Sequence, residues 1–197
     1  MFVLYLGLVG FLAFIIAVGI FGTWLRKNPT IENAEKSGRI MHYLFFAGLV
    51  APAVIVLITP GLSQLDGMIG IPSLPSNNVL LISGVLLAFP GLYLLGTSNK
   101  LLRSKGYGAN ASQLTDRIVQ TNIYERIRNP MSLGYYLWAL SLGLISESTF
   151  VTIFVLLGFV PAHIFFLKYF EEFELELRFG ESYKQYKQKV PFLIPKL

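Results

Sequence analysis

The sequence contains no cysteine and little charge, since only 14% of its 197 residues are Asp, Glu, Lys or Arg. The absence of cysteine excludes disulfide bonds, thiolate nucleophiles, Cys-ligated zinc and iron–sulfur clusters, and we expect no metal centre. The scarcity of charge, together with 54% hydrophobic residues and a mean hydropathy of +0.60, lies outside the composition of soluble proteins. The chain is therefore predicted to be an integral, multi-pass membrane protein.

Five stretches are apolar enough to cross a bilayer as helices, and the predicted fold class is therefore all-α with five transmembrane helices. A crossing takes about 20 apolar residues, because lipid offers the backbone no hydrogen-bond partner. The fourth stretch is short enough to need tilt or support from its neighbours. We interpret the first as a retained span, because it lacks the basic start and the cleavage site of a signal peptide. The five are Phe2–Leu25, Ile40–Ile58, Val79–Gly96, Met131–Ser146 and Thr149–Leu167.

The positive charges predict the orientation of these spans. All 16 Lys and Arg residues lie in three segments, 26–39, 100–128 and 168–196. With five spans these segments fall on one side, which the positive-inside rule makes cytoplasmic, so the N-terminus is expected outside. This placement explains the net charge of +5 by topology and attraction to anionic lipid headgroups, without nucleic acid as a partner.

We expect a single membrane domain over residues 1–197. Residues 1–97 would supply three spans as a scaffold on the substrate side, and residues 98–197 a cytoplasmic loop, a helical hairpin and a C-terminal helix. Arg128 lies about 20 residues before the hairpin turn and Glu171 about 24 after it, so both should emerge within about 6 Å of one height. Basic and acidic side chains are thus predicted to meet at the cytoplasmic face.

The start of the fourth span has the features of an anion site. Asn129 is a favoured N-cap and Pro130 a favoured first helical residue, which leaves free backbone N–H groups facing the cytosol. Arg128 beside them suits a carboxylate or phosphate, while Glu171 and Glu172 suit an ammonium or hydroxyls. A small ligand that carries both signs would fit. Taken singly, each feature also fits an ordinary cap, a topology signal or a solvated helix end.

The segment after Leu167 is predicted to be a cytoplasmic amphipathic helix. Its aromatic and aliphatic residues recur at helical spacing, with charged residues on the opposite face. We expect it to leave the membrane and fold back along the interface, either as a lid over the site or as a plain anchor. The apolar stripe consists of Phe166, Phe170, Phe173 and Leu177.

Two stretches in the C-terminal half resemble a known family. They read IVQTNIYERIRNPMSLG and FEEFELELRFGESYKQYKQKVPFLIP, and their order and spacing are similar to those of the membrane methyltransferases that include the isoprenylcysteine carboxyl methyltransferases and the phospholipid methyltransferases. The resemblance covers about Gly106 to Pro195. It implies an S-adenosyl-L-methionine-dependent methyltransferase with a lipid-like or lipidated acceptor, of the isoprenylcysteine carboxylate or phospholipid amine type.

The resemblance also implies a set of site residues around S-adenosylmethionine. Those expected to contact the cofactor are Ile118, Val119, Ile123, Tyr124, Arg128, Asn129, Glu171 and Glu172. Arg128, Asn129 and Glu171 are expected to act in catalysis.

This chain departs from the family pattern at three of its positions. Asn122 stands where glycine is usual, Asn129 where many members have histidine, and Ser132 where tyrosine is usual. The replacement at Asn129 removes the obvious general base from that position.

The acceptor stays open among a carboxylate, an amine and a thiol. Methyl transfer from a sulfonium is an in-line displacement, so positioning dominates catalysis. An amine or thiol also needs a base, for which Glu171, Glu172 and Tyr124 are candidates. Kinks at Pro52 and Pro90 would open a lateral path for a lipid-like acceptor, whose head we expect near Arg128.

The two histidines are not expected to supply the base. His42 begins the second span, where an interfacial role is expected. His163 lies inside the fifth span, where a bond to the carbonyl freed by Pro161 is expected, although an ionisable residue in a membrane is a functional candidate.

Two other functions remain compatible with these patterns. A transporter or structural membrane protein could keep the motif as a scaffold and would show no affinity for S-adenosylmethionine. A sterol-reductase-like NADPH enzyme shares an Arg-His-Pro and Glu-Glu arrangement, but those chains are longer and have more spans.

Overall fold

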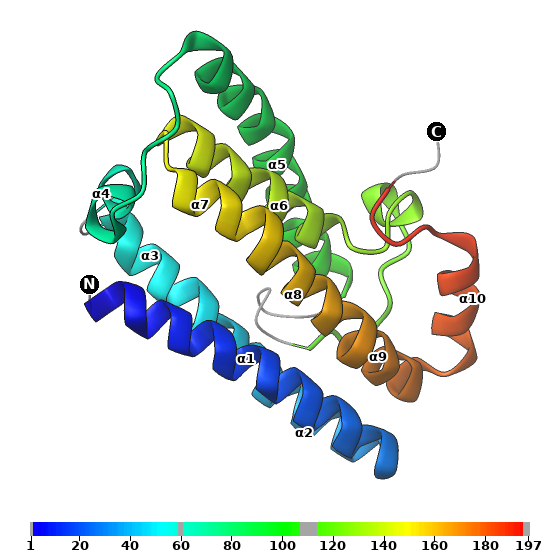
Figure 1. The fold of residues 1–197 in the computed structure, drawn as a ribbon. Coiled ribbons are helices and arrows are strands. Elements are labelled where there is room, and N and C mark those ends of the chain that lie inside the picture. Colours follow the sequence, from blue (N-terminus) through cyan, green and yellow to red (C-terminus); the bar gives the residue numbers. More distant parts are fainter. Residues whose placement is uncertain (1, 59–60, 107–113, 195–197) are drawn as a thin grey trace.

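The computed structural model describes residues 2–58, 61–106 and 114–194, and in these residues every regular element is a helix. The predicted all-α class is confirmed for this part of the chain (Figure 1). The N-terminal half contains α1 (Phe2–Lys27), α2 (Ile31–Phe45), η1 (Phe46–Val50), α3 (Ala51–Ile58), η2 (Leu62–Gln64), α4 (Leu65–Ile69) and α5 (Asn78–Lys105). The C-terminal half contains η3 (Asn122–Glu125), α6 (Pro130–Ile145), α7 (Thr149–Ile153), η4 (Phe154–Phe159), α8 (Val160–Phe166), η5 (Leu167–Glu171), α9 (Glu172–Phe179) and α10 (Glu181–Lys189).

Four helices of the described residues are long and apolar enough to cross a membrane. They are Leu4–Lys27, Ile31–Ile55, Asn78–Lys105 and Thr149–Phe179. The fourth predicted span is helix α6, whose 16 residues give a length of about 24 Å, short of a hydrocarbon core of about 30 Å. The chain is a multi-pass membrane protein, and four of the five long apolar helices in the described part of the chain reach the required length.

The long helices extend beyond the spans that hydropathy predicts. Thr30 caps the second helix by accepting a hydrogen bond from Asn33 N at 3.1 Å, so this helix begins at Ile31 rather than Ile40. Helix α5 likewise continues past Gly96 to Lys105. Both extensions are polar, which is why an apolar window leaves them out. They carry the basic residues to the end of the bundle where the site lies.

The main buried core lies where α1 and the α2–η1 helix meet the helix that runs from α7 to α9. Phe14, Met41, Phe45, Phe166 and Phe170 are buried there. The predicted apolar stripe after Leu167 therefore packs against α1 and α2 and does not lie along an interface. The helix continues unbroken to Phe179, and the chain reverses only at the next residue, a glycine with φ 56° and ψ −133°.

Helices α5 and α6 are packed closely through small residues. Gly84, Gly91 and Ser98 recur every seventh residue on α5 and are buried. A Cβ added to Gly91 would lie 2.8 Å from the backbone N of Trp138 and 3.2 Å from the O of Gly134. This contact fixes α6, and therefore the turn before it, against the C-terminal half of α5.

An aspartate fixes the opposite end of the hairpin. Asp66 of α4 is fully buried and accepts hydrogen bonds from Ser148 Oγ at 3.1 Å and from the backbone N–H groups of Thr149 at 2.7 Å and Phe150 at 2.8 Å. The carboxylate thus satisfies the free N–H groups at the start of α7. The turn of the predicted hairpin is short, since α6 ends at Ile145 and α7 begins at Thr149, and Glu147 in it has a left-handed conformation at φ 54°.

Candidate active site

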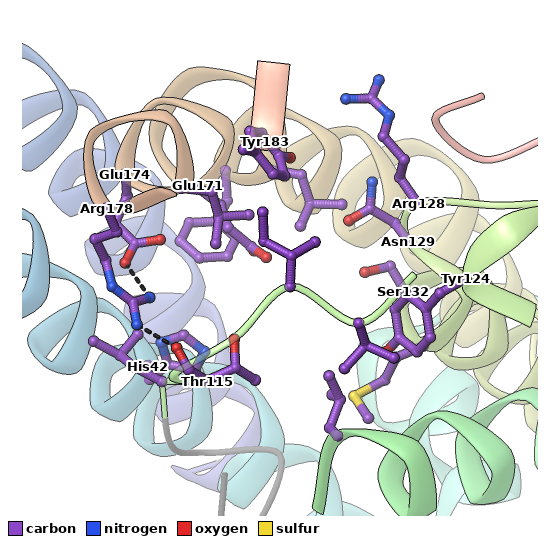
Figure 2. Close-up of a pocket in the computed structure, with 18 of the residues that line it drawn as sticks. His42, Thr115, Tyr124, Arg128, Asn129, Ser132, Glu171, Glu174, Arg178 and Tyr183 are labelled. Carbon is purple, nitrogen blue, oxygen red and sulfur yellow. Dashed lines mark hydrogen bonds and ion pairs between the residues drawn. The ribbon is translucent and has the colours of Figure 1, made fainter. Parts of the chain in front are cut away.

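A cavity opens at the end of the bundle that carries the basic segments. Residues of α2, segment 114–119, η3, the start of α6, η5, α9 and α10 surround it, and together with its mouth it holds about 1160 Å³ of space (Figure 2). Six of the eight predicted cofactor residues line it, namely Ile118, Val119, Tyr124, Arg128, Asn129 and Glu171. Ile123 and Glu172 are not part of its lining. Residues 107–113 and Pro195, which belong to the segment that resembles the family, lie outside the described residues.

The turn before α6 is held by the C-terminal segment. Arg128 N donates to Pro191 O at 2.9 Å, and Asn129 N donates to Phe192 O at 3.2 Å. The Asn129 side chain donates to the same Phe192 oxygen at 3.3 Å, so the predicted side-chain N-cap at Asn129 is not formed. Pro130 does occupy the first helical position. Two backbone hydrogen bonds thus fix the turn at one wall of the cavity.

Helix α10 holds η3 in place through a side-chain hydrogen bond. Tyr186 Oη donates to Tyr124 O at 2.7 Å, and both side chains are buried. Burial raises the pKa of the Tyr124 hydroxyl well above its usual range, so Tyr124 stays protonated at neutral pH and is a poor general base. Burial also raises the pKa of Tyr183, which lines the cavity from α10.

Asn122 has a left-handed backbone, with φ 61°. Asparagine and glycine are the residues that adopt this conformation most readily. The departure from the family's usual glycine is therefore conformationally conservative.

Glu172 is bound in a network of ion pairs. Its carboxylate lies 3.0 Å from Arg128 Nη1, from Lys168 Nζ and from Lys187 Nζ. In Figure 2 the Arg128 side chain does not point toward Glu171. The predicted meeting of Arg128 with the acidic pair is confirmed, but its partner is Glu172, and the guanidinium is engaged by protein.

Glu171 faces the cavity instead. Among the described residues no hydrogen-bond donor or cation pairs with its carboxylate. Its acidic neighbour Glu174 is neutralised by Arg178, with 2.8 Å between Oε1 and Nη1, and Arg178 also donates to Thr115 O. A carboxylate without a partner inside such a pocket is costly, and a cationic group of a ligand would stabilise it.

Several lining residues were missed from the sequence. Ser132 is buried at the first turn of α6, and His42 lines the cavity from α2. Tyr183 and Tyr186 stand in the quoted FGESYKQY segment, and their spacing of three places them on one face of a helix after Gly180. That spacing could have identified both tyrosines. The position of His42 depends on tertiary packing and gave no sequence signal.

A second cavity adjoins the first and is apolar. It lies between α1, the η1–α3 helix, α6 and the α7–η4 helix, and with its opening it holds about 1330 Å³. Phe45 and Tyr135 line both cavities. Leu4, Leu62 and Leu65 line it at the end nearest to α4. A hydrocarbon chain could therefore lie inside the bundle, next to the polar site.

His163 stands beside the boundary between the two cavities. Its Nδ1 lies 3.0 Å from Tyr136 Oη, and its ring stacks on Phe45 with 4.9 Å between centroids. The expected bond to the carbonyl freed by Pro161 is not formed, because Tyr136 is the partner of Nδ1. The described residues contain no group of three His, Cys, Asp or Glu side chains that could hold a metal ion.

Comparison with known proteins agrees with the resemblance. The family model described as phospholipid methyltransferase matches residues 79–182, more than half of the chain. No curated protein and no solved structure matches. The matched region contains all but the first residue of α5, the turn at Arg128 and Asn129, α6 and the helix that carries Glu171. The chain belongs to the phospholipid methyltransferase family of integral membrane methyltransferases.

Proposed function

We propose that the protein is an S-adenosylmethionine-dependent methyltransferase that acts on a lipid-like acceptor at the cytoplasmic face of the membrane. Family membership supports the reaction class. The observation that carries the cofactor is Glu171, a carboxylate without a protein partner among the described residues, in a cavity that begins at the N-terminus of α6. The gathering of all 16 basic residues in three segments supports the cytoplasmic orientation.

The cavity residues fit the groups of S-adenosylmethionine. Glu171 would bind its ammonium, and the free N–H groups of the first turn of α6 would bind its carboxylate. Ile118, Val119 and Tyr124 offer an apolar wall for the adenine ring. When bound, the cofactor supplies an electrophilic methyl group on a sulfonium.

The protein's contribution is positioning and exclusion of water. The Pro191 and Phe192 carbonyls fix the turn at Asn129, and Tyr186 fixes η3, so two walls of the cavity are rigid. An in-line displacement gains most from such preorganised walls. Arg128 would act on the site through Glu172, as part of the wall, because its guanidinium is already paired.

The second cavity supports a lipid-like acceptor. Its lining is apolar, it lies within the membrane-spanning helices, and it meets the polar cavity at Phe45 and Tyr135. We place the acceptor's hydrocarbon chain there and its polar head at this boundary, rather than beside Arg128. An apolar chain in such a space gains about 0.8 kcal/mol per buried CH₂.

Calorimetry on detergent-purified protein tests the cofactor site. Wild type should bind S-adenosylmethionine and S-adenosylhomocysteine, and Glu171→Gln should bind about 10- to 100-fold more weakly, because a charge-assisted contact is lost. Glu181→Gln is the matched control, since Glu181 is exposed on α10 and pairs only with Lys184 in the described structure. Its affinity should equal that of wild type. Absence of binding by folded wild type would favour the transporter or scaffold alternative.

A radiolabelled methyl transfer assay tests the acceptor. Purified protein would be incubated with labelled S-adenosylmethionine and vesicles of total membrane lipid, and the label in the organic extract counted. We expect label in the lipid fraction. Label found only in water-soluble amines or thiols would contradict the lipid-like acceptor but leave the cofactor site intact.

A further inference from the structure

His163 is a buried polar side chain that the proposed cofactor contacts do not use. It lies on α8, is 4% exposed, and lines the polar cavity. Its Nδ1 is bonded to Tyr136 Oη at 3.0 Å, whereas no partner of Nε2 is found among the described residues. One ring nitrogen is thus fixed, and the other is left for a molecule in the cavity.

The ring of His163 is surrounded by aromatic faces. The centroids of Phe45, Phe159 and Phe166 lie 4.9, 5.6 and 5.8 Å from its own, with interplanar angles of 24°, 8° and 11°. The face of an aromatic ring attracts a cation within about 6 Å. These ring faces would offset part of the cost of placing a proton on a buried imidazole, without a carboxylate.

The position of His163 is suited to an acceptor rather than to the cofactor. Phe45, which stacks on its ring, lines both cavities, and Phe159 lines the apolar one. Glu171 lies eight residues further along the same helix, which is a rise of about 12 Å. A molecule whose chain lies in the apolar cavity would bring its head to His163 first.

Of the other candidate bases around the polar cavity, Glu171 is assigned above to the cofactor's ammonium, and the rest are engaged by protein. Glu174 pairs with Arg178, and Glu172 pairs with three cations. Burial raises the pKa of Tyr124 and keeps it protonated. His42 donates from Nδ1 to Gly38 O at 2.9 Å, and Figure 2 shows it beside Thr115 and Arg178, across the cavity from Ser132.

We propose that His163 is the general base for the methyl acceptor and that the acceptor is an amine or thiol rather than a carboxylate. The inference rests on the proposed methyltransferase function. The acceptor atom forms a bond to the methyl carbon, the carbon–sulfur bond breaks with its electron pair on sulfur, and the acceptor's proton moves to Nε2. Tyr136 is a positioning residue: its hydroxyl oxygen accepts a hydrogen bond from Nδ1–H, which leaves the lone pair of the ring on Nε2.

The first test compares three acceptors that have the same alkyl chain and different head groups. Wild type in detergent micelles would be given S-adenosylmethionine with dodecylamine, dodecanethiol or dodecanoate. We expect methylation of the amine or the thiol. In His163→Gln we expect kcat about 100-fold or more lower, as for loss of a general base, with S-adenosylhomocysteine affinity unchanged. Methylation of dodecanoate alone, or kcat in His163→Gln within about threefold of wild type, would overturn the proposal.

The pH profile separates a base from a structural residue. A base must be unprotonated, so kcat/KM of wild type should fall as pH falls, and this acid limb should be lost in His163→Gln. Tyr136→Phe should keep the limb at a shifted position. The ionisable groups that face His163 from neighbouring helices are His42 on α2 and Tyr135 and Tyr136 on α6. Loss of the limb in His42→Gln, but not in His163→Gln, would assign it to His42.

A spectroscopic test does not need turnover. The chain has only two histidines, so ¹⁵N-histidine labelling with His42→Gln isolates His163. Addition of S-adenosylhomocysteine and dodecylammonium should move its Nε2 resonance upfield, because the ammonium N–H donates a hydrogen bond to the Nε2 lone pair, while S-adenosylhomocysteine alone should not. An Nε2 resonance that dodecylammonium leaves unchanged would overturn the proposal. If wild type does not bind S-adenosylhomocysteine, the methyltransferase function itself would be contradicted.

Discussion

Glu171 and Glu172 are adjacent in the sequence, yet they meet different surroundings. The Glu171 carboxylate faces the polar cavity, while Glu172 binds Arg128, Lys168 and Lys187 at 3.0 Å each. One step along a helix turns a side chain by about 100°. The pair therefore divides two tasks, since one carboxylate is available to a ligand and the other holds the walls together.

We predict opposite effects for the two glutamates. Glu172→Gln should lower the free energy of unfolding by about 2 kcal/mol, because it leaves the nearly buried Arg128 without its partner. Its affinity for S-adenosylhomocysteine should stay within about threefold of wild type. Glu171→Gln should lose affinity and keep its melting temperature, because it removes no protein contact. Thermal melts and calorimetry on both variants check this, and equal behaviour of the two would refute the division.

The close contact of α5 and α6 gives a second prediction. Gly91→Ala should destabilise the protein by about 1–3 kcal/mol, because the new Cβ would lie 2.8 Å from the backbone N of Trp138. Gly96→Ala, five residues along the same helix, is the control: a Cβ there meets nothing within 4 Å. Alanine at position 96 should be neutral or stabilising by up to about 1 kcal/mol. Melting curves in detergent would show the difference, and a stable Gly91→Ala would argue against the contact.

The backbone conformation of Asn122 gives a third prediction. A left-handed φ of 61° costs a β-branched residue about 1–2 kcal/mol more than glycine. Asn122→Val should therefore lower stability by about this amount, and Asn122→Gly should not. Thr121→Val is the matched control, since Thr121 has an extended backbone at φ −133° and its buried hydroxyl has no partner among the described residues. Denaturant titration in detergent would rank the three variants, and a neutral Asn122→Val would be the contrary result.

The sequence could predict at which end of the helical bundle the site lies, but not the direction in which each side chain of the site points. Counting residues from the hairpin turn correctly brought Arg128 to the acidic pair. The residue count could not predict which of Glu171 and Glu172 would pair with Arg128. The π-helical turns of η4 and η5 change the angle at which side chains leave the helix axis before the chain reaches the two glutamates. Short motifs do not reveal such turns.

The apolar cavity and the environment of His163 were beyond sequence reasoning for a related reason. Hydropathy identifies membrane helices but does not say which apolar residues face lipid and which face each other. Phe159 and Phe166 flank His163 on its own helix, four residues before it and three after it, but Phe45 reaches the ring only because α2 packs against that helix. The partner of His163 proved to be Tyr136 from the preceding helix rather than a backbone carbonyl of its own.

Asp66 gives the last prediction, at the end of the bundle opposite the site. Its carboxylate accepts three hydrogen bonds from residues 148–150 and is fully buried. Asp66→Ala leaves the first N–H groups of α7 unsatisfied, so we expect a loss of about 2–4 kcal/mol. Asp66→Asn keeps an acceptor without the charge and should lose about half as much stability.

Glu181→Ala is the control, because Glu181 is a solvent-exposed carboxylate in the first turn of α10. It should change the free energy of unfolding by less than about 0.5 kcal/mol. Because Asp66 joins α4 to the hairpin, its loss should also speed hydrogen exchange in residues 148–153, and slow exchange there in Asp66→Ala would show that another group caps the helix.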